Sequence, residues 1–84
     1  MEHYVIINEW VNDMDSGLSV IGVTHTFEEA KAILKESAAD ERAFAEDKGF
    51  EIYEDTDTLF DAGEDGFYST NHTILCIKSV YVKE

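Results

Sequence analysis

The residues of this chain most able to do chemistry are seven carboxylates in the acidic segment 51–65, which contains no lysine or arginine. They are Glu51, Glu54, Asp55, Asp57, Asp61, Glu64 and Asp65. The segment supplies more than half of the formal net charge of −13. Carboxylates at this density attract divalent cations and basic protein surfaces, and they repel nucleic acid. We therefore expect no direct binding to nucleic acid.

A dedicated metal site is not expected in this segment. Asp55-Thr56-Asp57 has a D-x-D pattern, but a calcium loop of the EF-hand type needs glycine at its sixth position and glutamate at its twelfth. Counted from Asp55, those positions hold Phe60 and Gly66. The sequence predicts no metal ligands and no cofactor, and weak adventitious binding of calcium or magnesium is the alternative.

Catalytic constellations are also missing from the sequence. His3, His25 and His72 have no zinc-site spacing, and Cys76 is the single cysteine. A nucleophilic thiol needs a paired base and electropositive surroundings, and this acidic chain offers the reverse. The sequence therefore predicts a protein that is not an enzyme.

A second group of carboxylates lies on the predicted helix. Glu29, Glu36, Asp40 and Asp47 recur at spacings of seven, four and seven residues, which places them within an arc of about 40°. We call these four residues the carboxylate stripe. Lys31, Lys35 and Arg42 fall on a different side of the helix, where Arg42 can pair with Glu46. The stripe is either a solvated surface or, together with the acidic segment, an imitation of a phosphate backbone.

The composition is that of one small globular domain, residues 1–84. A hydrophobic fraction of 44% in 84 residues is enough for a packed core and too high for a disordered acidic tail. A lone cysteine and the lack of a signal peptide or a bilayer-spanning run predict a cytoplasmic protein without membrane contact.

The first half of the chain predicts a hairpin followed by a helix. His3–Val11 and Leu18–Thr24 are rich in β-branched residues and are separated by turn formers. In the first strand, alternation places Val5, Ile7 and Val11 on one face and Tyr4, Ile6 and Trp10 on the other. The helix is expected over Phe27–Lys48, with Thr26 and Glu29 as a capping box and Gly49 as its stop.

The second half predicts two or three more strands. Phe50–Glu54 and His72–Val82 have strand composition, Leu59–Ala62 can be extended, and turns are expected at Asp55–Thr58 and Gly63–Gly66. The fold class is therefore α+β: a single antiparallel sheet of four or five strands with one long helix on one face, in the order ββαβ(β)β.

Two features do not fit a simple helix-on-sheet core. Glu41 falls inside the apolar arc of the helix, so it lies beyond the sheet edge, at a bend, or against a partner. A single helix covers one sheet face only, so some aromatic side chains, Trp10 among them, are expected to be half-buried on the open face or to anchor a partner.

The order of these motifs resembles that of small acidic proteins of bacteria and their phages. The resemblance lies in the opening hairpin with YVIINEW, the helix entry V-x-x-T-F-E-E-A and the acidic C-terminal hairpin. In size and charge the chain is also similar to phage inhibitors of host defence, including DNA-mimic anti-restriction and anti-CRISPR proteins. The resemblance implies no catalytic residue, and it implies the cytoplasm of a host cell as the location.

Two functional hypotheses follow. In the first, the chain is an acidic binding protein from a phage or mobile element that occupies a basic, nucleic-acid-binding surface of a host protein. Its contacts would be Glu29, Glu36, Asp40, Asp47, Asp55, Asp57, Asp61, Glu64, Asp65 and Trp10. In the second, it is a housekeeping interaction domain that homodimerises through its open sheet face by means of Trp10 and nearby aromatics, with its charge serving solubility.

Overall fold

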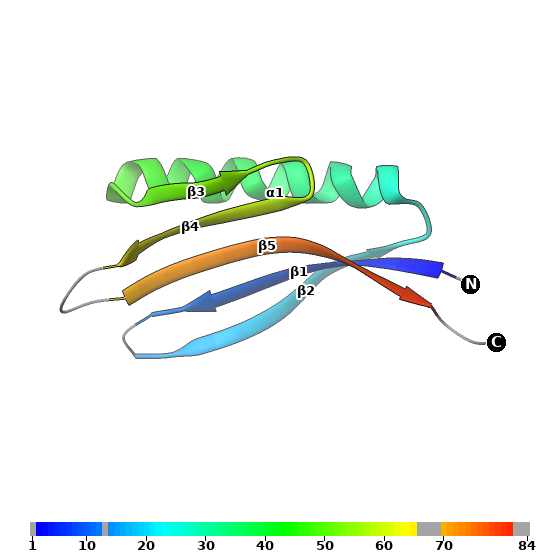
Figure 1. Ribbon diagram of the computed structural model, residues 1–84, viewed down its shortest axis with the longest axis horizontal. Coiled ribbons are helices and arrows are strands. Elements are labelled where there is room, and N and C mark those ends of the chain that lie inside the picture. Colours follow the sequence, from blue (N-terminus) through cyan, green and yellow to red (C-terminus); the bar gives the residue numbers. More distant parts are fainter. Residues whose placement is uncertain (1, 13, 66–69, 82–84) are drawn as a thin grey trace.

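The computed structural model describes residues 2–12, 14–65 and 70–81, and the side chains of Asp65 and Thr70 are not described. The elements are β1 (Glu2–Val11), β2 (Ser16–Thr24), α1 (Phe27–Lys48), β3 (Glu51–Asp55), β4 (Leu59–Asp65) and β5 (Thr70–Tyr81). The five strands form one antiparallel sheet in the order β2-β1-β5-β4-β3, and α1 packs against it (Figure 1). The predicted α+β architecture is confirmed.

Helix α1 begins and ends where its caps are. Thr26 is in an extended conformation, and its hydroxyl oxygen accepts a hydrogen bond from the Glu29 backbone N–H at 3.2 Å. That hydroxyl also donates to the Glu29 carboxylate, so this side chain does not close the reciprocal half of the predicted capping box. At the other end, Gly49 is left-handed with φ of 74°.

The core lies between α1 and one face of the sheet. Ile6 from β1, Phe60 from β4, Leu75 from β5 and Leu34 from α1 are fully buried there. The helix contributes otherwise small side chains, namely Ala30, Ala38 and Ala45. A helix lined with alanine approaches the sheet closely, but it fills little of the space beside its axis.

Strand alternation divides the sheet into two faces. The uninterrupted register of β1 with β5 keeps Tyr4, Ile6 and Trp10 on the helix side and Val5, Ile7 and Val11 on the other, as predicted. The register of β1 with β2 shifts between Ile6 and Ile7, where β2 carries the extra residue of a bulge.

Strand β4 is longer than the sequence indicates. Gly63, Glu64 and Asp65 continue the strand and pair with β5, so the turn predicted at Gly63–Gly66 is wrong for these three residues, and Gly66 lies outside the described residues. Gly63 fits because its backbone lies against β5: a Cβ there would be 2.3 Å from the Asn71 carbonyl oxygen. Among the described residues, no helix has the length and apolar character needed to cross a bilayer.

Candidate functional site

The open face of the sheet, on the side away from α1, is an aliphatic surface. We define it by the outward residues Val5, Ile7, Val11, Leu18, Val20, Val23, Leu59, Ile74, Cys76 and Val80. Leu18, Val20 and Val23 are 59%, 56% and 59% exposed. Monomeric proteins rarely expose a continuous apolar patch spanning several strands, and such patches mark interaction sites.

Among the described residues, few charges interrupt the part of the open face formed by β2, β1 and β5, where Glu9 and Lys78 are exposed. The register of β3 with β4 puts Glu51, Glu54 and Asp61 on the same face at its other edge, where Asp61 pairs with the His72 imidazole. Tyr53 packs edge-on against His72, with ring centroids 5.8 Å apart. Where the β1–β2 hairpin ends, the face is hollowed by a shallow depression of 480 Å³ between Val11, Leu18, His72 and Ile74. Charge is therefore nearly balanced over the β2, β1 and β5 part of this face, whereas the part formed by β4 and β3 is acidic.

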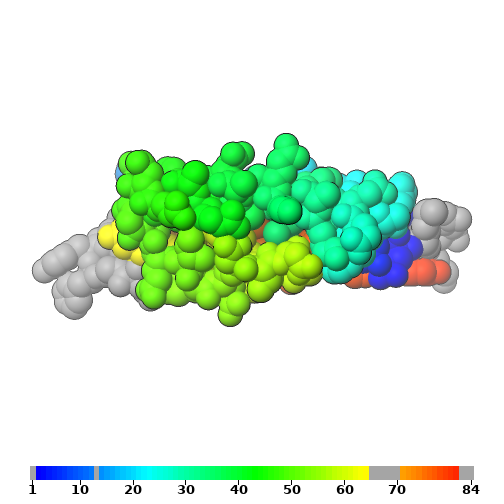
Figure 2. Space-filling view, turned by 90° about the horizontal axis from the view of Figure 1, so that it is seen from above, coloured from blue at the N-terminus to red at the C-terminus, as the bar shows by residue number. Residues whose placement is uncertain are grey.

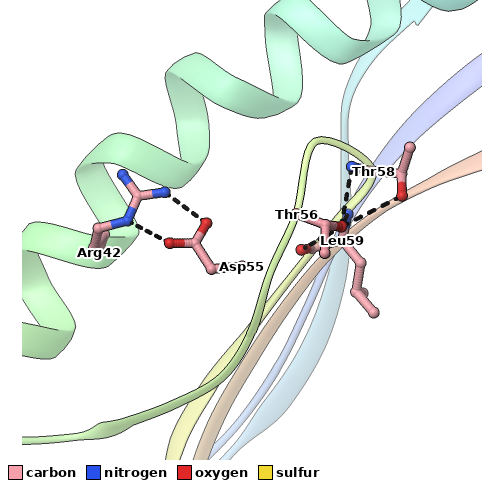
Figure 3. Close-up of polar contacts among 5 residues, drawn as sticks. All are labelled: Arg42, Asp55, Thr56, Thr58 and Leu59. Carbon is pink, nitrogen blue, oxygen red and sulfur yellow. Dashed lines mark hydrogen bonds and ion pairs between the residues drawn. The ribbon is translucent and has the colours of Figure 1, made fainter.

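The acidic segment is partly neutralised by the helix. Asp55 receives two hydrogen bonds from Arg42, at 2.8 Å from Nε and 2.7 Å from Nη2 (Figure 3). These bonds hold the pKa of Asp55 below its usual range and raise that of Arg42. Lys31 lies 3.7 Å from Asp57 and 3.1 Å from Glu28. Two of the predicted contact carboxylates are thus engaged inside the molecule.

The carboxylate stripe faces away from the sheet. Counted at 100° per residue from buried Leu34, its four residues lie about 120–160° away, whereas Lys31, Lys35 and Arg42 lie about 60–100° away in the opposite sense. All four stripe residues are exposed. The helix and the β3–β4 hairpin lie side by side (Figure 2), but the cationic side of α1 is the side that meets β3. The stripe and the acidic segment are therefore separated by a row of cations and do not form one surface.

The remaining predicted contact residues are spread over different surfaces. Glu64 is exposed near the end of β4, and Asp65 is in the same strand with a side chain that is not described. Asp61 is on the open face with His72. Residues that were predicted to form one contact surface therefore lie on different surfaces of the molecule.

Trp10 does not belong to the open face. Its alternation with Ile6 turns it to the helix side, where it lies over Gly17 so closely that a Cβ on Gly17 would be 2.5 Å from the indole ring. Although β1 has no bulge that would reverse its side chains, Trp10 also borders the depression at the hairpin end of the open face, so its role as a dimer anchor stays a prediction.

The D-x-D pattern forms a closed turn. The Thr56 hydroxyl accepts from the Leu59 N–H at 3.0 Å, and the Thr56 N–H donates to the Leu59 carbonyl at 2.9 Å (Figure 3). Within the described part of the chain, no three histidine, cysteine, aspartate or glutamate side chains are placed to hold a metal ion. Cys76 is half-buried in the middle of the open face, opposite Ile7.

The comparisons with known proteins give no further assignment. No protein-family model, curated protein or solved structure matches the chain.

The open face was predicted as a dimer surface with aromatic anchors, and the aliphatic residues that form this surface were missed. Its signal was present in the sequence, because both alternating sets of residues in β1 and β5 are largely apolar. Strands of this kind are typical of sheets covered on both faces.

Proposed function

We propose that this protein is a non-enzymatic protein-binding module whose main contact surface is the open face of its sheet. The observation that carries the proposal is the continuous aliphatic surface across β2, β1 and β5. Burying apolar surface stabilises association by about 25 cal/mol per Å², and sheets pack face to face at about 10 Å.

A second copy of the chain is the occupant best matched to this face. The net charge of −13 would draw a basic partner to the helix and to the free carboxylates of the acidic segment. The β2, β1 and β5 part of the open face carries Glu9 and Lys78 and otherwise mainly neutral side chains, so two copies can stack over these three strands with their acidic helices and the carboxylates of β3 and β4 outside the contact. This arrangement keeps like charges apart while covering both apolar faces.

Sedimentation equilibrium at micromolar concentration tests the dimer. We expect the wild type to be a dimer and Val20→Asp to be a monomer, because the new carboxylate would be buried in the interface. Ala39→Asp adds the same charge on the outer side of α1, where Ala39 is exposed, and should leave the dimer intact. A wild type that stays monomeric, or an Ala39→Asp variant that dissociates equally, would contradict the proposal.

A second candidate function uses the carboxylate stripe. Glu36, Asp40 and Asp47 are exposed and form no ion pair with any described residue, so they are available to a basic surface. The function would be to occupy a nucleic-acid-binding surface of another protein, as an inhibitor from a phage or mobile element directed at host defence would do. The size and charge of the chain support this candidate.

Capture of partners from host lysate at low and high salt tests this second candidate. Binding should weaken steeply with salt, and the triple variant Glu36→Gln, Asp40→Asn and Asp47→Asn should lose it. The matched control is the triple variant Glu51→Gln, Glu54→Gln and Glu64→Gln, which removes the same number of carboxylates from β3 and β4 and leaves the stripe intact. Binding that ignores salt, or that survives the stripe variant, would exclude this function.

A further inference from the structure

A hollow between α1 and the sheet is lined by aromatic rings and one carboxylate. It has a volume of 190 Å³ and lies where the second half of α1 crosses the end of β1, the first half of β4 and the start of β5. Its wall includes Trp10, Glu41, Phe44, Phe50 and Phe60. At about 30 Å³ per water molecule, this volume is roughly that of six waters, or of an alkyl chain with a charged head.

Glu41 lies on the sheet-facing side of α1, about 20° around the helix from the fully buried Leu34. Ala38 and Ala45, one turn to either side, are each 2% exposed and belong to the core. An apolar side chain at position 41 would close the space between them. The glutamate instead leaves a hollow with a carboxylate in its wall.

The Glu41 carboxylate has no cation to pair with among the described residues. Arg42 is directed to Asp55, and Lys31 to Glu28 and Asp57. Burial, and secondly the charge of Asp40, raise the pKa of Glu41, which is the sign of a carboxylate without compensation. On the same side of β1, two residues before Trp10, the Asn8 side-chain oxygen is also buried without a donor.

The aromatic rings in the wall of the hollow add a second attraction for a cation. Phe44 and Phe50 meet edge to face with centroids 5.9 Å apart, and Phe44 is 52% exposed at the rim. Lys48 already holds its ammonium group 5.8 Å from the centre of the Phe44 ring. Aromatic faces attract cations within about 6 Å, and a nearby carboxylate adds to that attraction.

We propose that this hollow is a binding site for an organic cation, a protonated amine or a guanidinium group, with Glu41 as counter-ion and Trp10, Phe44 and Phe50 as the aromatic wall. The hollow adjoins the open-face depression, with which it shares Trp10, Val11 and His72, and it includes no residue of the carboxylate stripe. The cation is either the end of a lysine or arginine side chain of a basic protein or a free small amine.

The single tryptophan of the chain reports on the site directly, because Trp10 is in its wall. Titration with n-butylammonium chloride, against sodium chloride of equal ionic strength, should change Trp10 fluorescence and its indole N–H resonance saturably. A five-atom ligand of this kind binds with a Kd on the order of 1 mM. Neutral n-butanol should bind at least tenfold more weakly.

Two variants separate the site from general electrostatics. Glu41→Gln keeps the shape and removes the charge, and it should weaken n-butylammonium at least tenfold. Glu36→Gln removes the same charge from the outer side of α1 and should change the affinity less than twofold. Equal binding by Glu41→Gln and wild type, equal loss in both variants, or equal affinity for n-butanol would overturn the proposal.

Two further probes identify the source of the cation. A capped Gly-Lys-Gly tripeptide that binds more tightly than n-butylammonium assigns the site to a protein side chain. Tighter binding of the free amine assigns it to a small molecule. If both fail to perturb Trp10 at concentrations well above the expected Kd, the hollow is not a cation site.

Discussion

Glu41 occupies a position where a helix on a sheet ordinarily carries leucine, and its effect on stability can be predicted. Because its pKa is raised in the fold, the stability contributed by the protonated form is fully present below the ordinary value of 4.5 and is lost as pH rises through the folded-state value. At pH 7 the charged Glu41 carboxylate therefore destabilises the folded state relative to its protonated form. We expect Glu41→Gln to be more stable than wild type at pH 7, by less than about 1 kcal/mol because solvent screens the group, with the difference shrinking as pH falls through the raised folded-state pKa and levelling off below 4.5.

Filling the hollow should stabilise the protein further. Glu41→Leu removes the carboxylate and packs against Trp10 and Phe60, so we expect a gain of about 1–2 kcal/mol in the free energy of unfolding by urea. The same variant should lose amine binding, as stability and function would then compete for this position. Unchanged or lower stability would mean that the hollow is too open to water for an apolar side chain to fill.

The contribution of Asp55 to stability should change with pH in the opposite direction to that of Glu41. The Arg42 hydrogen bonds lower its pKa, so its contribution is present above the ordinary value of 3.8 and is lost as pH falls through the lower folded-state value. Asp55→Asn should reduce the Tm at pH 7 by roughly 1–3 °C and have no effect at strongly acid pH. Glu54→Gln, an exposed neighbour, is the matched control and should change the Tm less.

The candidate site was only partly predictable at the level of single residues. Sequence spacing offers Arg42 a partner in Glu46, one turn along the helix, but the structure pairs it with Asp55 across the β3 edge. Spacing along a helix finds neighbours at three and four residues, and a contact over thirteen residues depends on how α1 crosses the sheet. The position of Glu41 inside the apolar arc was visible in the sequence, whereas its aromatic neighbours come from β1, β4, the helix and the segment between α1 and β3.

At the scale of elements, the helix was predicted correctly and the strands less so. Both ends of α1 are set by local chemistry, Thr26 at the start and Gly49 at the end, and the predicted range Phe27–Lys48 is confirmed. Strand ends are set by pairing partners instead. β4 runs on through Gly63 because β5 is there to pair with it, although glycine by itself favours a turn.

Substitution by alanine should reduce stability by different amounts at Gly49 and at Gly63. Gly49 has positive φ and open space around it, so Gly49→Ala should cost about 1 kcal/mol through backbone strain alone. Gly63 has a carbonyl oxygen where a Cβ would be, so Gly63→Ala must push β4 and β5 apart and should cost about 1–3 kcal/mol. Chemical denaturation of both variants measures the difference, and a smaller loss for Gly63→Ala would contradict the close strand contact.

At the scale of the whole molecule, charge and apolar surface are segregated. Many of the carboxylates lie on the outer side of α1 and along β3 and β4, while the part of the open face formed by β2, β1 and β5 is nearly neutral. Composition alone shows the excess charge but not this division, because the strand order β2-β1-β5-β4-β3 is what brings the apolar strands together. The division allows an acidic protein to associate with itself without bringing its charges into contact.

The salt dependence of association follows from that segregation and separates the two proposed functions. Between about 0.1 M and 1 M salt the Debye length falls from roughly 10 Å to 3 Å, which screens the repulsion between two chains of charge −13. A dimer held by the open face should therefore tighten as salt rises, by severalfold in sedimentation equilibrium. A complex between the carboxylate stripe and a basic surface should loosen over the same range. If self-association weakened with salt, the contact between copies would be electrostatic and would lie elsewhere than on the open face.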